Sequence, residues 1–351
     1  MSNAMGGAIA LAADAGTSGS ATQGRGSDII ATEEDVFYAY RLLLARKPDP
    51  EGWEGCRRLI AEERTSPDQL ARLFMDSAEF QVRNGAASAE RPLIEVTLDG
   101  FSLMVRSDDR DIGYHIRTQH AYEPHVTAAI RTLLRPGDVF VDVGANIGFF
   151  ANMAASLVGR DGVVVAVEPL DKNLQLLYRS LERNGFENVA VHACAASDRV
   201  ALIAILTDPG TSNGQPLAST GSNPLHRFVQ TRRLDDLTAN LRRMDVVKFD
   251  IDGFELLAWR GFRESMMKHQ PIVLTEFHPY GMRQYVGVDP LDYLAELFSY
   301  AGTVDVLSPQ PGQVTPCASA AEVMRQWEIT NEEGQGEGRI HLDLLVKPKR
   351  R

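Results

Sequence analysis

Cysteine is scarce in this sequence of 351 residues, and the scarcity limits the class of protein. The three cysteines, Cys56, Cys194 and Cys317, lie far apart and have neither the spacing of metal ligands nor that of a disulfide framework. A reduced, intracellular protein fits this pattern best.

Basic residues are outnumbered by acidic ones, and long apolar runs are scarce as well. The net charge is -11, and the lysines and arginines are scattered, so nucleic acid is not expected as a partner. No stretch approaches the roughly 18 to 20 apolar residues that span a bilayer. The N-terminus has no charged region before its short Ala-rich segment, so a secretory signal is not expected either. We expect a cytoplasmic protein without a membrane span.

The first 30 residues contain little that could be buried. "MSNA" before Met5 looks like the remnant of an expression tag, and residues 6–28 are mostly Gly, Ala, Ser and Thr. This composition predicts a disordered leader over residues 1–30, and "GAASAERP" predicts a linker over residues 85–92.

Between these segments the sequence predicts a small all-α domain over residues 31–84, with three or four short helices. Thr32 is a plausible N-cap, and Val36 and Tyr40 begin an apolar series at helical spacing that Leu43 and Leu44 continue. A later helix starts at "SPDQ", where Ser66 caps and Pro67 takes the first position.

Two runs in this segment, "Y-x-x-L-L-x-R-x-P-D-x-x-G" from Tyr40 and "F-x-x-S-x-E-F" from Phe74, resemble a known small helical domain. That domain is found beside glycosyltransferases and on bacterial surface proteins, so the resemblance implies a connection with glycans. A plain packing or oligomerisation role stays open, with a second copy or another protein as the partner.

Residues 93–351 predict a doubly wound α/β domain with a mostly parallel sheet. A hairpin turns at Asp99-Gly100, and a helix over residues 126–134 leads into near-continuous apolar strands that alternate with helices. The strands are expected at residues 138–143, 163–168, 188–194, 245–250 and 272–277, and the helices at 147–158, 171–183 and 254–261. Two closing strands are expected near residues 303–309 and 341–349, with a helix near 320–327 between them. The Gly-, Pro- and Ser-rich residues 208–224 predict either a functional lid or disorder.

A glycine-containing turn follows the first apolar strand, in "VFVDVGANIGFF" from Val139 to Phe150. Ligands of open parallel sheets bind at the carboxyl ends of the strands, and the turn from Gly144 to Gly148 lies there. Its spacing departs from the G-x-G-x-x-G pattern of dinucleotide sites, which favours a ligand without phosphates. Glu168 ends the second strand, 20 residues after Gly148, where a carboxylate can accept hydrogen bonds from a ribose. Together these features predict an adenosyl ligand.

Several motifs in this order resemble the FkbM-type methyltransferases, which are S-adenosylmethionine-dependent enzymes of the class I, Rossmann-like fold that mostly methylate hydroxyls of sugars and natural products. They are "AYEP", "VFVDVGANIGFF", "VVAVEPLDKNLQLLYRSLERNG", "VHACAASD", "RRLDDL", "DVVKFDIDGFELLAWRG" and "PIVLTEFHP". The resemblance implies a cofactor site made of Tyr122, Glu123, Asp142, Gly144, Ala145, Asn146, Gly148, Glu168, Pro169, Ala196, Ser197, Asp198 and Asp250. The chain has Asp252 where the family usually has glutamate, and a shorter carboxylate has less reach.

Methyl transfer to a hydroxyl needs a base near the methyl group, and candidates stand at two strand ends. The predicted catalytic residues are Asp250, His278, Lys248 and Glu276. Lys248 lies in an apolar strand and is expected to pair with a nearby acid. Asp250, Asp252, Glu276 and His278 offer ligands that suit Mg²⁺, but their spacing is not diagnostic, so no metal site is predicted.

The sequence therefore predicts an O-methyltransferase that uses S-adenosyl-L-methionine and acts on a hydroxyl of a saccharide or saccharide-like metabolite. Two alternatives stay open. One is a non-catalytic adenosyl-binding or interaction module, and the other is an NAD-dependent dehydrogenase, which the missing third glycine disfavours.

Overall fold

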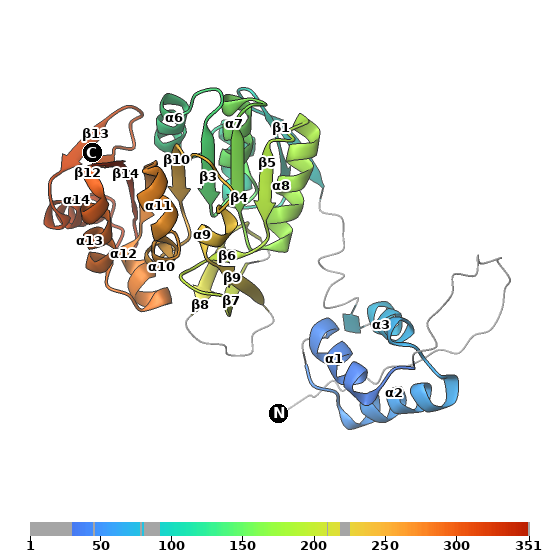
Figure 1. Cartoon of the computed structure of the whole chain (residues 1–351). Coiled ribbons are helices and arrows are strands. Elements are labelled where there is room, and N and C mark those ends of the chain that lie inside the picture. The colour runs from blue at the N-terminus through green and yellow to red at the C-terminus, as the bar shows by residue number, and fades with distance from the viewer. Residues whose placement is uncertain are drawn as a thin grey trace. The chain divides into compact units, whose positions relative to one another are not determined.

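The computed structural model describes residues 30–349 except 45, 78, 81–91, 209 and 218–224. The chain divides into two compact units, residues 1–91 and 92–351 (Figure 1). The predicted leader and linker lie almost entirely outside the described residues.

The described part of the smaller unit is helical. It contains α1 (Glu33–Leu43), α2 (Pro50–Glu63) and α3 (Pro67–Asp76). Thr32 and Ser66 cap α1 and α3 as predicted, each in a capping box with the residue three positions later. Val36, Tyr40 and Leu44 are fully buried, so the apolar series read from the sequence forms the core of this unit.

The run from Tyr40 to Gly52 has a packing explanation. Arg46 donates to Glu79 at 2.6 Å and to Asp49 at 2.8 Å, and its guanidinium lies 4.8 Å from the centre of the Tyr40 ring. Asp49 accepts from the backbone N–H of Gly52, where a Cβ would come within 1.9 Å of the Tyr40 hydroxyl. The residues of this run therefore fix the turn between α1 and α2.

The larger unit is an α/β domain, as predicted. Its first half contains β1 (Leu93–Thr97), β2 (Ser102–Arg106), α5 (Ile112–Gln119), α6 (Pro124–Leu133), β3 (Val139–Val143), α7 (Phe149–Val158), β4 (Val163–Val167), α8 (Asp171–Asn184), β5 (Val189–His192), β6 (Ala195–Ala196), β7 (Ala201–Thr207), β8 (Gly214–Leu217) and β9 (His226–Arg232). Its second half contains α9 (Leu234–Leu237), β10 (Val246–Phe249), α10 (Glu255–Arg260), α11 (Arg263–His269), β11 (Ile272–Phe277), α12 (Pro279–Gly281), the π-helix η1 (Met282–Val286), α13 (Pro290–Tyr300), β12 (Ala301–Leu307), β13 (Val314–Cys317), α14 (Ala320–Glu333) and β14 (Leu342–Pro348).

An eight-stranded sheet crosses this unit in the order β13-β12-β14-β11-β10-β3-β4-β5 (Figure 1). The strands from β11 to β5 are parallel, whereas β14 enters antiparallel between β11 and β12. After β3 the chain builds outward through β4 and β5, and it later returns to β10 on the other side of β3. The order therefore reverses between β3 and β10, and a ligand crevice is expected beyond their carboxyl ends.

Alternating residues of the strands face two separate cores, because successive side chains of a strand point to opposite faces. Val141, Val247 and Phe277 pack in a core with residues of α10, α11, α13 and α14. Phe140 and Leu274 face a second core with residues of α6, α7, α8 and the β1–β2 hairpin. Both faces of the sheet are thus covered, which explains why its strands read as continuous apolar runs.

A second sheet of four strands, in the order β6-β9-β7-β8, was not predicted. It comes from residues 195–232, and the insert expected to be a lid or disordered contributes β8 at residues 214–217. Residues 218–224 of that insert lie outside the described part of the chain. Among the described helices, none is both long and apolar enough to cross a bilayer.

Candidate active site

The turn after β3 needs glycine because two protein segments meet there. Gly144 has a φ of +89°, and a Cβ at this position would lie 1.9 Å from the carbonyl oxygen of Asp250 at the end of β10. The N–H of Gly144 donates to the carbonyl of Val167, at the end of β4. The ends of three neighbouring strands are therefore held together at Gly144.

Gly148 serves helix packing. Its φ is +91°, and a Cβ would lie 2.3 Å from Cδ1 of Leu177 in α8. Between the two glycines, Asn146 adopts a left-handed φ of +49°, and its N–H donates to Oε2 of Glu168 at 3.0 Å. The glycine turn and the acid that follows β4 are thus parts of one hydrogen-bonded structure.

A pocket with about 630 Å³ of empty space opens at this edge of the sheet. The turn after β3, the segment after β4, the second sheet and the segment after β10 all contribute to its wall. The lining residues are Val143, Gly144, Asn146, Val167, Glu168, Pro169, Leu170, Asn173, Cys194, Ala195, Ala196, Ile203, Ile205, Ser212, Asn213, Gly214, Asp250, Ile251, Asp252 and Phe254.

Glu168 is the buried acid of the pocket wall. Its carboxylate accepts from the N–H groups of Asn146 and Leu170 and from the side-chain amide of Asn173, at 2.9 to 3.1 Å. Burial raises its pKa to about 7, although these three donors act in the opposite direction. A carboxylate has about four acceptor positions, so one position remains for a donor on a ligand.

The loop before β8 closes one side of the pocket and is tied to α8. Asn173 donates to the carbonyl of Ser212 at 2.9 Å, and Lys172 donates to that of Thr211 at 2.7 Å. Asn213 accepts from the side chain of Asn146 at 3.4 Å and donates to Asp111. Residues 212–214 of the insert therefore form part of the pocket wall.

A stripe of polar side chains crosses the sheet on the face covered by α6 and α7. Asp142, Lys248, Glu276 and Asp343, here called the polar stripe, lie on the neighbouring strands β3, β10, β11 and β14. Asp142 is paired in register with Lys248, and Glu276 with Asp343. Each of the four is two positions along its strand from a residue that faces the second core. All four side chains therefore point to the same side of the sheet.

Lys248 and Asp250 form the central ion pair of the site. The ammonium lies 2.6 Å from Asp250 Oδ2 and 4.5 Å from the centre of the Phe150 ring. Burial opposes the charge of Lys248, but Asp250, Glu123 and Asp142 together raise its pKa above the usual value. Burial would raise the pKa of Asp250, and Lys248 reverses this and keeps the pKa below its usual value.

Two further acids adjoin this pair. Burial raises the pKa of Asp142 to about 6 and that of Glu123 to about 8, and Lys248 lowers both. Neither oxygen of Asp142 has a hydrogen-bond partner among the described residues. The ammonium of Lys248 therefore counters the charge of three acids.

The start of α6 contributes aromatic packing and a histidine. The ring of Tyr122 lies 5.7 Å from that of Phe149 and 6.0 Å from that of Phe150. His125 lies 2.7 Å from Asp343 through Nε2, so α6 is joined to the polar stripe at β14.

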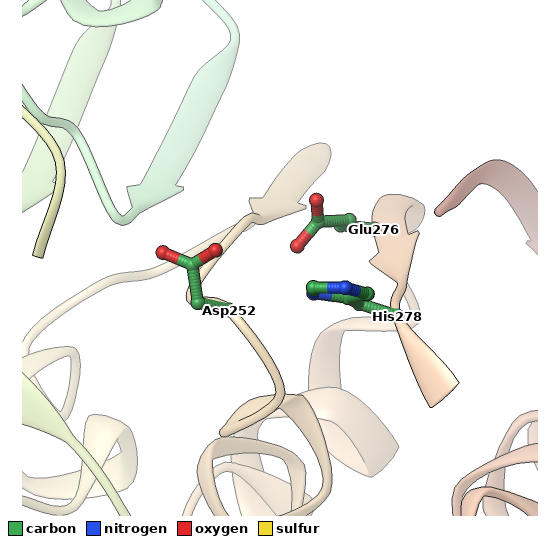
Figure 2. A group of neighbouring side chains, drawn as sticks. All are labelled: Asp252, Glu276 and His278. Carbon is green, nitrogen blue, oxygen red and sulfur yellow. The ribbon is translucent and has the colours of Figure 1, made fainter. Parts of the chain in front are cut away.

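Beside this ion pair, Asp252, Glu276 and His278 converge (Figure 2). These three residues are called the carboxylate–histidine trio. Their candidate ligand atoms all lie within 4.8 Å of one another. Burial, with Glu276 and Asp250 nearby, raises the pKa of Asp252 well above its usual value, and burial lowers the pKa of His278. His341 lies 2.9 Å from Glu276, which raises the pKa of that histidine to about 11.

The predicted cofactor residues fall into two groups. Six of them line the pocket: Gly144, Asn146, Glu168, Pro169, Ala196 and Asp250. Seven lie outside its lining: Tyr122, Glu123, Asp142, Ala145, Gly148, Ser197 and Asp198. The backbone of Ser197 instead packs against Gly261, where a Cβ would lie 2.0 Å from the Ser197 carbonyl oxygen.

Sequence reasoning missed several residues of the site. Asn173 supports Glu168 from α8, and Ile203 and Ile205 line the pocket from the unpredicted sheet. His341 and Asp343 were also missed, although "HLDLLV" alternates polar and apolar residues, which predicts that both face one side of a strand.

Comparison with known proteins supports the family resemblance. Residues 142–302 match the model of the Methyltransferase FkbM domain. Protein-L-isoaspartate O-methyltransferase 1 of Archaeoglobus fulgidus is 36% identical over 70 residues, which are 19% of this chain and 32% of that protein. Protein-L-isoaspartate O-methyltransferase of Methanopyrus kandleri is 28% identical over 127 residues, 36% of this chain and 48% of that protein. The chain thus spans less than half of the length of each of these curated relatives.

A solved structure of methyltransferase FkbM from Methylobacillus flagellatus KT is also similar. It is 17% identical, with a TM-score of 0.36, and the match covers 76% of this chain and 70% of that one. The likeness to the FkbM methyltransferases therefore rests on residues 142–302, which match the model of that domain.

Proposed function

We propose that this protein is an S-adenosylmethionine-dependent O-methyltransferase that methylates a hydroxyl of a saccharide or saccharide-like metabolite. The observation that carries the proposal is a pocket whose wall contains both Glu168 and Asp250. One acid is suited to an adenosyl ligand and the other to a hydroxyl. The family match favours this function over the dehydrogenase alternative.

The residues of the pocket fit the cofactor. Glu168 has one acceptor position left for a ribose hydroxyl, and Leu170, Ile203, Ile205 and Phe254 offer apolar surface for a purine. When bound, S-adenosylmethionine would supply a methyl group on a positively charged sulfur. Gly144 and Asn146, at the turn between Glu168 and Asp250, would adjoin its central part.

Asp250 is the base in this proposal. Of the four predicted catalytic residues it alone lines the pocket, and its side chain is 28% exposed while that of Lys248 is 4% exposed. An acceptor hydroxyl can therefore reach Asp250 but not Lys248. Lys248 orients the carboxylate and keeps it ionised, so that Asp250 can accept the hydroxyl proton as the oxygen attacks the methyl group.

The acceptor class is testable by mass spectrometry of candidate acceptors incubated with S-adenosylmethionine. Nucleotide-sugars, oligosaccharides and lipid-linked glycans form the test set, and we expect one added methyl on a sugar hydroxyl. A peptide containing isoaspartate should be included, because two relatives are named for that activity. Methylation of the peptide alone would contradict the saccharide assignment.

Replacing Glu168 should weaken cofactor binding. Glu168→Gln removes the negative charge of the group that would accept from the ribose. It also places the N–H donors of an amide against donors that the carboxylate now accepts from. Hydrogen bonds to charged groups contribute about 1.5–3 kcal/mol, so calorimetry should show affinity for S-adenosylhomocysteine falling by about 10- to 150-fold. The exposed Glu187 gives the control, since Glu187→Gln should bind normally. Unchanged affinity in the Glu168 variant would remove the support for the adenosyl assignment.

Cofactor binding should also depend on pH through Glu168. Burial raises the pKa of this carboxyl to about 7 in the free protein, and the ribose hydroxyl donates to the ionised form. Below pH 7 a proton must leave before binding, so affinity for S-adenosylhomocysteine should fall by up to about tenfold per pH unit and be constant above pH 8. Glu168→Gln should lack this component. A wild-type affinity that is flat from pH 5.5 to 8 would contradict the assignment.

A further inference from the structure

The carboxylate–histidine trio lies at the edge of the pocket. Asp252 belongs to both, since it lines the pocket and also faces Glu276 and His278. Figure 2 shows the side chains of the trio pointing toward one another from two adjacent strand ends. Metal–oxygen distances of about 2.0–2.6 Å allow two ligands of one ion to be about 4–5 Å apart. The 4.8 Å limit on the separations within the trio is compatible with a shared ion.

Two atoms of the trio lack a partner, which is an independent indication of a ligand. Oε2 of Glu276 and Nδ1 of His278 are buried and have no hydrogen-bond partner within the described residues. Glu276 is only 7% exposed, so water does not readily satisfy its carboxylate. Buried polar atoms are normally paired, so two unpaired atoms at one place are a candidate binding site for a ligand.

The surrounding residues hold the trio in position. Oε1 of Glu276 lies 2.9 Å from His341 Nδ1, which leaves Oε2 as the open oxygen. Glu255 accepts from the N–H groups of Ile251 and Gly253 at 3.0 and 3.3 Å and so fixes the loop that presents Asp252. Asp252 itself has a left-handed φ of +52°. Hydrogen-bonded support of this kind is typical of residues behind metal ligands.

The local charge is also in favour of a cation. Asp252 and Glu276 bring two carboxylates together, and the neighbouring cationic side chains are already engaged, Lys248 by Asp250 and His341 by Glu276. Ionisation of both carboxyl groups would therefore leave one negative charge that these side chains do not counter.

We propose that Asp252, Glu276 and His278 bind a divalent cation through one oxygen of each carboxylate and Nδ1 of the histidine. Carboxylates suit Mg²⁺, Ca²⁺ and Mn²⁺, whereas imidazole suits later transition metals. Mn²⁺ accepts both kinds of ligand and is the ion that best fits the trio. Water or the methyl acceptor would fill the remaining coordination positions of the ion.

A bound cation also indicates which class of acceptor the site would take, and this inference rests on the proposed methyl transfer. An acceptor with two vicinal hydroxyls can chelate the ion at the pocket edge, next to Asp250. Coordination makes a hydroxyl more acidic, so its proton passes more readily to Asp250. The hydroxyl oxygen then forms its bond to the methyl carbon while the carbon–sulfur bond breaks, and the electron pair of that bond stays on sulfur to give a neutral thioether.

Titration of the full chain with Mn²⁺, followed by loss of the free-ion electron paramagnetic resonance signal, tests the binding directly. We expect one Mn²⁺ per chain, with binding at least about tenfold weaker in Asp252→Asn, Glu276→Gln and His278→Gln. Asp252→Glu keeps the charge and should retain binding. His269 lies before β11, at the opposite edge of the sheet, so His269→Gln is the matched control and should bind as wild type. Thermal melts show which variants are folded.

Absence of binding below about 1 mM, or wild-type binding in both His278→Gln and Asp252→Asn, overturns the cation site. This result is independent of catalysis because neither cofactor nor acceptor is present. With an acceptor, treatment with EDTA should abolish methylation and added Mn²⁺ should restore it. Mn²⁺ binding without any methyl transfer would instead overturn the proposed function while the cation site stands.

Discussion

Asp250→Asn is expected to lower kcat for methyl transfer by about 10²- to 10⁴-fold, the usual contribution of a general base. Asparagine keeps the size of the side chain at the pocket wall but cannot accept the hydroxyl proton. The change is measured by steady-state kinetics with the acceptor that the mass-spectrometric screen identifies. Because the loss is in the chemical step, kcat should fall much more than KM changes.

The control must separate loss of the base from loss of the ion pair. Asp161→Asn, at an exposed site, should leave kcat unchanged. Affinity of Asp250→Asn for S-adenosylhomocysteine shows whether the pocket is intact. A variant that binds the cofactor product normally and retains more than about a third of wild-type kcat would rule out Asp250 as the base. Full activity would also restore the alternative of a protein whose adenosyl site has no catalytic role.

The fold was predictable because its core strands are buried on both faces. Val139 to Val143 and Val163 to Val167 are apolar at nearly every position, which only a covered parallel sheet explains. The glycine turn and Glu168 were predictable from spacing alone, because the carboxyl ends of adjacent parallel strands meet at one edge. The match of residues 142–302 to the Methyltransferase FkbM domain agrees with the resemblance read from the sequence.

The reasons why this turn requires glycine were harder to predict from the sequence. Glycines in a turn beside a ligand are expected either because a side chain would block the ligand or because it would force an unfavourable φ. The positive φ values agree with the second reason, but the atoms that would clash belong to Asp250 and Leu177. Such contacts join segments that are about 30 to 105 residues apart along the chain, which local patterns do not encode.

The composition of the polar stripe could not be predicted either. Strand β14 lies antiparallel between β11 and β12, so the end of the chain brings His341 and Asp343 beside Glu276. Local alternation indicates which side of a strand these residues face, but it does not indicate the neighbouring strand. The second sheet was missed for a related reason. Its short strands include β6, of only two residues, which gives no periodic signal.

Lys248→Met is expected to lower the free energy of unfolding by about 3–5 kcal/mol, the usual cost of removing one partner of a buried ion pair. Methionine keeps most of the volume but leaves Asp250 and Asp142 without their cation, and Asp142 is fully buried. The measurement is denaturant unfolding at pH 7.5 without cofactor. At this pH both acids would be ionised in the unfolded chain, so the measured free energy of unfolding should include the full cost of burying them without their cation.

A second variant separates loss of charge compensation from simple loss of packing. Lys248→Met combined with Asp250→Asn removes one of the carboxylates that the single change leaves without a cation. The double variant should therefore recover part of the stability that the single change loses. Arg183→Met breaks an exposed pair with Glu95 and should change stability little. If the double variant were as unstable as the single one, packing around Phe150 would be the main role of Lys248. In that case the ion pair would not be what holds Asp250 in its reactive form.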